Sequence, residues 1–101
     1  METRIETSDD TSIIIIDENY LLGNENEKFQ NLIQNSIAQG SKNISVDLSR
    51  VQFISSWGIE GFLHAYKICK NKNVNFCLKN VNANIINVLS TLRLTHIINI
   101  T

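Results

Sequence analysis

This sequence has neither an excess of charge of one sign nor a long apolar run. The 101 residues carry a formal net charge of −1, and the lysines are scattered instead of forming a basic stripe, so nucleic acid is not expected as a direct ligand. The longest aliphatic run, Ile13 to Ile16, is far shorter than the about 20 apolar residues that a membrane helix needs. The first ten residues lack the apolar segment of a signal peptide. These absences predict a cytoplasmic protein that does not insert into membranes.

Motifs of catalysis and of metal binding are also missing. The sequence has no glycine-rich phosphate loop, no G-x-S-x-G elbow and no H-E-x-x-H motif. The histidines, His64 and His96, are far apart and have no acidic or cysteine ligand set beside them, which favours surface or packing roles. Cys69 and Cys77 lie in apolar contexts without C-x-x-C spacing, so we expect free thiols, with a disulfide or a metal site as the alternative. No enzymatic activity, cofactor or bound metal is therefore predicted.

The most informative stretch runs from residue 43 to residue 70. Ile44, Val46 and Leu48 alternate with polar residues, which is the period of a strand with one buried face. The period then changes, and apolar residues recur at helical spacing, at Ile59, Phe62, Leu63 and Tyr66. The helix is expected to begin near Ser56, whose hydroxyl would cap it. The stretch thus predicts a buried strand, then a short turn that contains serines, and then a helix.

Strands and helices also alternate before this stretch. Residues 1–10 are polar and predict a frayed start or an edge strand. The isoleucine run within Thr11 to Asp17 predicts a central strand covered on both faces, and a short strand is expected at Tyr20 to Leu22. A helix that begins at Asn24 or Asn26 would end at Gln39, with Gly40 as its C′ residue.

Three elements follow the central stretch. Val74, Phe76 and Leu78 alternate with polar residues and predict a strand. Asn82 is a candidate cap for a helix with four apolar positions, Ile85, Ile86, Leu89 and Leu92, and a last strand is expected from His96 to Ile100. Because the chain is long enough for one core only, residues 1–101 are predicted to form a single α/β domain. Its central sheet should be mixed or mainly parallel, with crossover helices packed against it.

The motif around Ser56 resembles that of the STAS domains, whose type members are bacterial anti-sigma factor antagonists, also called anti-anti-sigma factors. In this family an apolar-Asp-Leu-Ser strand end precedes Phe-x-Asp-Ser-x-Gly-Leu at a helix start. The matching segments here are Val46-Asp47-Leu48-Ser49 and Phe53-Ile54-Ser55-Ser56-Trp57-Gly58-Ile59. The resemblance covers residues 11 to 100 in element order. It implies the STAS fold, here lacking a full C-terminal helix, so that an exposed part of the sheet or the third helix would allow a homodimer to form.

Compared residue by residue, Ser56 falls on the family's phosphorylatable serine. Ser55 stands where the family usually has aspartate, which removes a negative charge beside that hydroxyl, and Ser55 remains an alternative site of modification. Trp57 replaces a residue that is usually small. On the helix, Ser56, Glu60, His64 and Lys67 share one polar face. The predicted partner-binding residues are therefore Ser55, Ser56, Trp57, Gly58, Glu60, His64 and Lys67.

Two glycines and the tryptophan shape this predicted surface. Gly58 has no Cβ, so another backbone or a ligand could approach the helix start. The Trp57 ring either tucks under the preceding loop or lies exposed as an interface anchor. In the exposed arrangement, Gly61 would leave open space beside the ring.

The resemblance implies a non-enzymatic regulatory switch in which a phosphate on Ser56 releases a protein partner without unfolding the domain. Its partners would be a serine kinase with a histidine-kinase-like ATPase fold, a metal-dependent serine phosphatase and an unidentified downstream protein. Similarity to STAS regulators of biofilm formation suggests that output. One alternative is a constitutive subunit of a transporter ATPase complex, in which Ser56 only caps the helix. The other is a small-ligand-binding module, for which the sequence offers no convergent set of polar residues.

Overall fold

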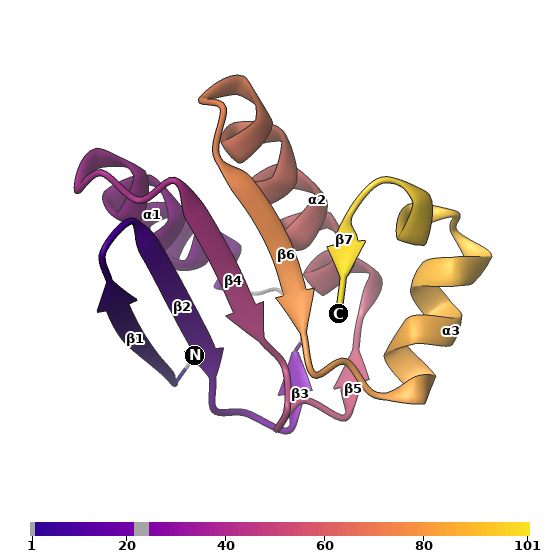
Figure 1. Cartoon of the computed structure of the whole chain (residues 1–101). Coiled ribbons are helices and arrows are strands. Elements are labelled where there is room, and N and C mark those ends of the chain that lie inside the picture. Colours follow the sequence, from indigo (N-terminus) through magenta and orange to yellow (C-terminus); the bar gives the residue numbers. More distant parts are fainter. Residues whose placement is uncertain (1, 22–24) are drawn as a thin grey trace.

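The main sheet has five strands in the order β1-β2-β4-β6-β7, in a computed structural model that describes residues 2–21 and 25–101 (Figure 1). β1 runs antiparallel to β2, and every other neighbouring pair is parallel. The sheet is therefore mixed and mostly parallel, as predicted. The strands are β1 Thr3–Ser8, β2 Thr11–Ile16, β4 Asn43–Asp47, β6 Asn75–Lys79 and β7 Asn99–Ile100.

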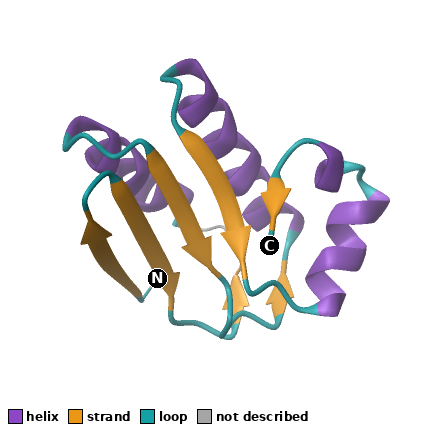
Figure 2. Cartoon of the chain, viewed as in Figure 1, coloured by secondary structure: helices purple, strands orange, loops and turns teal. Residues whose placement is uncertain are grey.

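Three helices connect the parallel strands. α1 (Asn26–Ala38) and α2 (Ser56–Asn71) lie on the same face of the sheet, and α3 (Ala83–Thr91) lies beyond β7 (Figures 1 and 2). A second, two-stranded parallel sheet joins β3 (Tyr20–Leu21) to β5 (Phe53–Ile54). This small sheet positions the candidate site, because β5 leads directly into α2.

The core fills the space between the sheet and the helix pair α1–α2. On the helix side of the sheet, alternate residues such as Ile14, Val46 and Leu78 have no exposed surface, as the two-residue period of a strand requires. The helices contribute residues at helical spacing, among them Phe29 and Phe62, whose rings meet edge to face at 5.8 Å between centroids. The buried helical residues that complete this core are Ile33, Ile59, Ala65 and Cys69.

The prediction that Thr11–Asp17 is a central strand covered on both faces was wrong. Burial alternates along β2: Ser12, Ile14 and Ile16 are buried, whereas the residues between them are only half-buried. β4 holds the central place in the sheet. The reason lies in the helices, because α1 and α2 both cover one face, and no element of the described chain lies over the other (Figure 1).

The C-terminal elements are shorter than predicted. In α3, Ile85 and Leu89 are buried as expected, but Ile86 and Leu92 are 37% and 54% exposed, since this helix packs at the edge of the molecule. Arg93 then adopts a left-handed conformation with φ 61°. A single 3₁₀ turn, Leu94–His96, occupies part of the predicted His96–Ile100 strand, and only Asn99–Ile100 pairs with β6.

The caps of α1 and α3 agree with the sequence predictions. Gly40 follows the C-cap of α1 with φ 101°, a conformation that glycine adopts without steric cost. Asn82 caps α3 through its side chain. The predicted strand at Tyr20 to Leu22 is present as Tyr20–Leu21, while Leu22 and the alternative helix start at Asn24 lie outside the described residues.

Candidate functional site

The site lies where the C-terminal ends of β4 and β6 meet the small sheet. Asp47 at the end of β4 accepts hydrogen bonds from the Ser49 backbone N–H (2.9 Å) and from the Asn80 side chain (3.3 Å). Partial burial would raise the pKa of Asp47, but these hydrogen bonds outweigh it and hold that pKa below its usual value. The carboxylate thus ties the segment that leads to β5 to the segment that leads to α3.

The N-cap of α2 is Ser55, which corrects the prediction that Ser56 caps this helix. Ser55 has extended backbone angles, and its hydroxyl oxygen accepts a hydrogen bond from the Gly58 N–H at 3.2 Å. Ser56 is the first helical residue and is exposed. Both serines fit the sequence rule for a cap, and the position where β5 stops pairing with β3 decides between them. The cap therefore occupies the Ser55 hydroxyl and leaves the Ser56 hydroxyl at the surface.

Three exposed aromatic side chains lie on the small sheet and at the helix start that follows it. Trp57 is 70% exposed, so the interpretation that its ring tucks under the preceding loop was wrong. Tyr20 and Phe53, which face each other across the small sheet, are 52% and 48% exposed, with ring centroids 5.6 Å apart. We call Tyr20, Phe53 and Trp57 the aromatic surface.

The polar face predicted for α2 is present as an exposed ridge. Glu60, His64 and Lys67 are all exposed, and together with Asn26 and Gln30 of α1 they line a shallow hollow between the two helices. Ser56, Trp57 and Glu60 line a second hollow at the start of α2. Glu60 lines both hollows, so it lies between them on the exposed face of α2.

Gly61 does not leave open space, contrary to the sequence expectation. It is buried against α1, and a Cβ at this position would collide with the Asn26 side chain. The Asn26 amide donates to the Trp57 carbonyl and the Gln30 amide to the Gly61 carbonyl, each at 2.9 Å. These two contacts fix the first turns of α2 against α1. Sequence reasoning missed the roles of Asn26 and Gln30, because the sequence does not indicate which residue a polar side chain on an amphipathic helix contacts.

The cysteines and histidines take no part in this surface apart from His64. Cys69 is a buried free thiol, and burial raises its pKa to about 11. Cys77 is a half-buried free thiol whose sulfur lies 3.1 Å from the Ser45 hydroxyl on the uncovered face of the sheet. Within residues 2–21 and 25–101, no group of three or more His, Cys, Asp or Glu side chains could hold a metal ion, and no helix has both the length and the apolar character to cross a membrane.

These features place the protein in a known class. The STAS domain family model matches residues 2–101, and the chain belongs to the STAS domain family. Residues 46 to 49 and 53 to 59, which carried the resemblance in the sequence, lie at the end of β4, in β5 and at the start of α2. A search of curated protein sequences found no match.

Solved structures of low sequence identity share this fold. An anti-sigma factor antagonist from Mycobacterium paratuberculosis is 16% identical, with a TM-score of 0.81 over 98% of this chain and 83% of the other. The Bacillus cell fate determinant SpoIIAA in its phosphorylated form is 18% identical, with a TM-score of 0.75 over 99% and 91% of the two chains. A sulfate transporter family protein from Wolinella succinogenes is 13% identical, with a TM-score of 0.78 over 89% and 72%.

Proposed function

We propose that this STAS domain is a non-enzymatic regulatory switch in the cytoplasm, whose binding of a protein partner is controlled by phosphorylation of Ser56. The observation that carries the proposal is that the two adjacent serines have different environments. The Ser55 hydroxyl caps α2, and the exposed Ser56 hydroxyl makes no hydrogen bond with any described residue. A kinase could therefore modify Ser56 without removing the helix cap.

The fold should tolerate the phosphate. A phosphoserine adds about −1.5 to −2 charge and three acceptor oxygens. At the first residue of α2 these oxygens would lie beside backbone N–H groups that have no acceptor within the helix, at the positive end of the helix dipole. The first turn of α2 contains no acidic residue. Glu60, four residues after Ser56, is exposed, so its repulsion of the phosphate should cost only a few tenths of a kcal/mol, about the size of an i,i+4 pair. The modified domain should thus remain folded.

A docked partner would not tolerate the same charge. Ser56 shares a hollow with Trp57 and Glu60, so the phosphate would add to the negative charge of Glu60 beside an exposed tryptophan. Exposed aromatic side chains are the residue type that most often dominates the energy of an interface. An extra charge that loses its water at such an interface costs several kcal/mol, on the order of a buried unpaired ion. Phosphorylation should therefore release the partner from the aromatic surface and the ridge.

The enzymes of the proposed switch rest on family membership and on similarity to anti-sigma factor antagonists. They are a serine kinase with a histidine-kinase-like ATPase fold and a metal-dependent serine phosphatase that reverses the modification. The proposed output in biofilm formation rests only on the resemblance to STAS regulators of that process. One of the similar structures is a phosphorylated form, which supports a kinase and phosphatase pair in general terms. The downstream target is a protein that recognises unmodified Ser56 and its surroundings.

Mass spectrometry of phosphopeptides tests the proposal directly. The protein would be isolated from its native host with the candidate kinase present or deleted, alongside Ser55→Ala and Ser56→Ala variants. We expect kinase-dependent phosphate on Ser56 in the wild type and in Ser55→Ala, and none in Ser56→Ala. In cells, Ser56→Asp should mimic the released state and Ser56→Ala the bound state. Phosphate on Ser55 alone, or equal activity of the two Ser56 variants, would refute the proposal.

A second candidate function is a constitutive adaptor subunit of a transporter complex. It is favoured by the similarity to the structure of a sulfate transporter family protein. In that role the same surface would bind a transporter component permanently. Affinity purification of the wild type, Ser56→Ala and Ser56→Asp separates the two functions, because an adaptor retains the same partner in all three forms.

A further inference from the structure

The free edge of β1 is the longest strand edge that the described chain leaves unpaired. β1 pairs with β2 along all six of its residues, and none of the helices and strands in residues 2–21 and 25–101 lies on its other side (Figure 1). Five of these six residues are exposed. Natural proteins usually protect such an edge with charged side chains, lysine above all, or with proline, a bulge or a covering loop. The charged residues of β1 are Arg4 and Glu6, which have opposite signs and can therefore pair across a contact between two copies. β1 contains neither proline nor lysine, and its pairing with β2 is continuous.

The backbone geometry determines which groups point outward from this edge. The Glu2 carbonyl accepts from the Asp17 N–H at 2.9 Å, which makes Glu2 and Asp17 a hydrogen-bonded pair. In an antiparallel ladder such pairs alternate with pairs that are not hydrogen-bonded. Arg4, Glu6 and Ser8 therefore direct their backbone groups toward β2. The N–H and C=O groups of the three residues between them, Thr3, Ile5 and Thr7, point away from the sheet.

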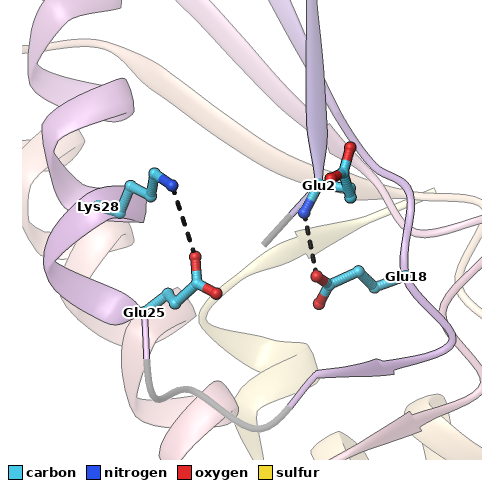
Figure 3. A network of polar contacts seen from close by, with 4 residues as sticks. All are labelled: Glu2, Glu18, Glu25 and Lys28. Atoms are coloured by element: carbon cyan, nitrogen blue, oxygen red, sulfur yellow. Dashed lines mark hydrogen bonds and ion pairs between the residues drawn. The ribbon is translucent and has the colours of Figure 1, made fainter.

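The start of β1 is held in place. The Glu2 N–H donates to the Glu18 carboxylate at 3.0 Å, which ties this end of β1 to the segment after β2 (Figure 3). The same view shows Glu25 and Lys28 at the start of α1, whose side chains form an ion pair at 3.8 Å. The outward groups of β1 are thus presented by a strand that is fixed on one side and at its start.

We propose that this edge pairs with the same edge of a second copy of the chain, in antiparallel orientation, with the twofold axis passing beside Ile5. Ile5 then lies opposite Ile5 of the second copy, and Thr3 lies opposite Thr7. All three residues are the ones whose backbone groups point outward, so each opposing pair exchanges both N–H···O bonds. The two five-stranded sheets become one continuous sheet, and the contact is isologous, as twofold symmetry requires.

The side chains of β1 complement each other in this register. Arg4 lies opposite Glu6 of the second copy, and Glu6 lies opposite Arg4, so opposite charges meet twice on the uncovered face of the sheet. Neither Arg4 nor Glu6 has an ion pair with another described residue. On the helix side Ile5, which is 44% exposed, packs against its copy. Directly opposed pairs of this kind stabilise strand pairing.

The neighbouring registers are disfavoured by charge. The next two registers that still pair outward-pointing backbone groups have the twofold axis beside Arg4 or beside Glu6 instead of Ile5. With the axis beside Arg4, Arg4 lies opposite Arg4 and Glu2 lies opposite Glu6. With the axis beside Glu6, Glu6 lies opposite Glu6. Like charges directly opposite one another destabilise a pair of strands. The sequence TRIETS therefore selects one register for pairing with itself.

The proposed dimer leaves Ser56 and the aromatic surface accessible. Ser56 and Trp57 belong to α2, and β5 pairs only with β3, so neither element contributes to the β1 edge. A dimer would carry two such surfaces. Because the interface excludes Ser56, dimer formation should not depend on its phosphorylation, and failure of this inference is distinguishable from failure of the switch.

Analytical ultracentrifugation over a concentration series tests the inference with charge-reversal variants. Arg4→Glu places two glutamates opposite each other at both ends of the contact, and Glu6→Arg places two arginines there. Each variant alone should dissociate about tenfold more readily or be monomeric, since two attractive pairs become two repulsive ones. A mixture of the two variants restores opposite charges at both positions and should form a heterodimer. The double variant Arg4→Glu/Glu6→Arg should dimerise like the wild type.

Circular dichroism of each variant checks that the fold is intact, which is expected because both side chains are exposed. A wild type that stays monomeric up to its solubility limit would overturn the inference. It would also be overturned by a dimer that both single variants leave intact, since the interface would then lie elsewhere. A mixture of folded single variants that fails to associate would exclude the proposed register.

Discussion

α2 and α3 begin with the same local arrangement but use it differently. Ser55 and Asn82 both have extended backbone angles, and each side chain accepts a hydrogen bond from the N–H three residues later. Asn82 also donates its amide to the Val51 and Gln52 carbonyls, at 3.1 and 3.2 Å. Its side chain thus fastens the segment before β5 to α3. At α2, Ser55 supplies the cap, and the next residue, Ser56, presents a second hydroxyl to solvent.

The difference shows how a structural and a reactive role can be separated. A polar cap whose hydrogen-bonding groups are all occupied resists modification, because any change removes several contacts at once. Two adjacent serines divide these roles, so the helix start keeps its cap while the exposed hydroxyl changes its chemical state. Asn82 supports this arrangement indirectly, since it holds the segment that carries β5 and the serines.

The largest effect should follow from Asn82→Ala. This change removes the cap of α3 and both bonds to the segment before β5, and should lower the free energy of unfolding by about 2 kcal/mol. Chemical denaturation measures the loss. Asn84→Ala, two residues further along and exposed, is the matched control and should be near neutral. If the two variants lose equal stability, the comparison between the two helix starts fails.

Ser55→Ala should have the next largest effect. Loss of the cap bond that the Ser55 hydroxyl accepts from the Gly58 N–H should cost about 1 kcal/mol. Ser55→Asp keeps an acceptor at the cap position and should retain most of the stability, since aspartate is also a preferred N-cap. Thermal unfolding of the two variants side by side provides the measurement. A larger loss in Ser55→Asp than in Ser55→Ala would contradict the cap assignment.

Asp47 links the segments that lead to the two helices, and its contribution should depend on pH. Its folded-state pKa lies below the unfolded value, so the stability that it contributes is present above the unfolded pKa and is lost as the pH falls through the folded pKa. Because the carboxylate is only half-buried, Asp47→Asn should cost less than about 1 kcal/mol at neutral pH. Denaturation between neutral and acidic pH should show the wild type and the variant converging. Parallel curves would exclude this role.

The smallest effect on stability should come from Ser56→Ala. The Ser56 side chain is exposed and caps nothing, so the change should stay within about 0.5 kcal/mol of the wild type. The same variant should lose all phosphorylation at this helix start, whereas Ser55→Ala loses stability and keeps phosphorylation. These opposite outcomes are the sharpest test of the comparison. A Ser56→Ala protein as destabilised as Ser55→Ala would mean that both hydroxyls support the helix.

Much of the fold followed from periodicity. Alternation at Ile44, Val46 and Leu48 and the helical spacing from Ile59 predicted the buried strand and helix, because the same periods govern which side chains face a core. Periodicity failed for Ile13 to Ile16, since an unbroken apolar run carries no information on which face is covered. It also overestimated the last strand, because a left-handed Arg93 and a 3₁₀ turn are decided by packing around Leu94, which is buried.

The site was only partly visible in the sequence. The motif from Phe53 to Ile59 pointed to the helix start, and Asn82 was recognisable as a cap from its residue type and position. The contacts of Asn26 and Gln30 with α2 join residues 31 positions apart, and no local pattern marks them. The pairing of Tyr20 with Phe53, which brings two aromatic rings together, likewise depends on a two-stranded sheet too short to be recognised from alternation.

The sequence by itself determined the order of strands and helices, most of the apolar residues that form the core and the stretch that holds the candidate site. These properties are local, because they depend on side-chain period, cap residues and turn residues within a few positions. Tertiary structure alone decided that one face of the sheet stays uncovered, that β1 has a free edge and that Ser55 is the cap while Ser56 remains exposed. Each of these depends on where a segment stops pairing with another that is distant in the chain, and local residue preferences do not encode that point.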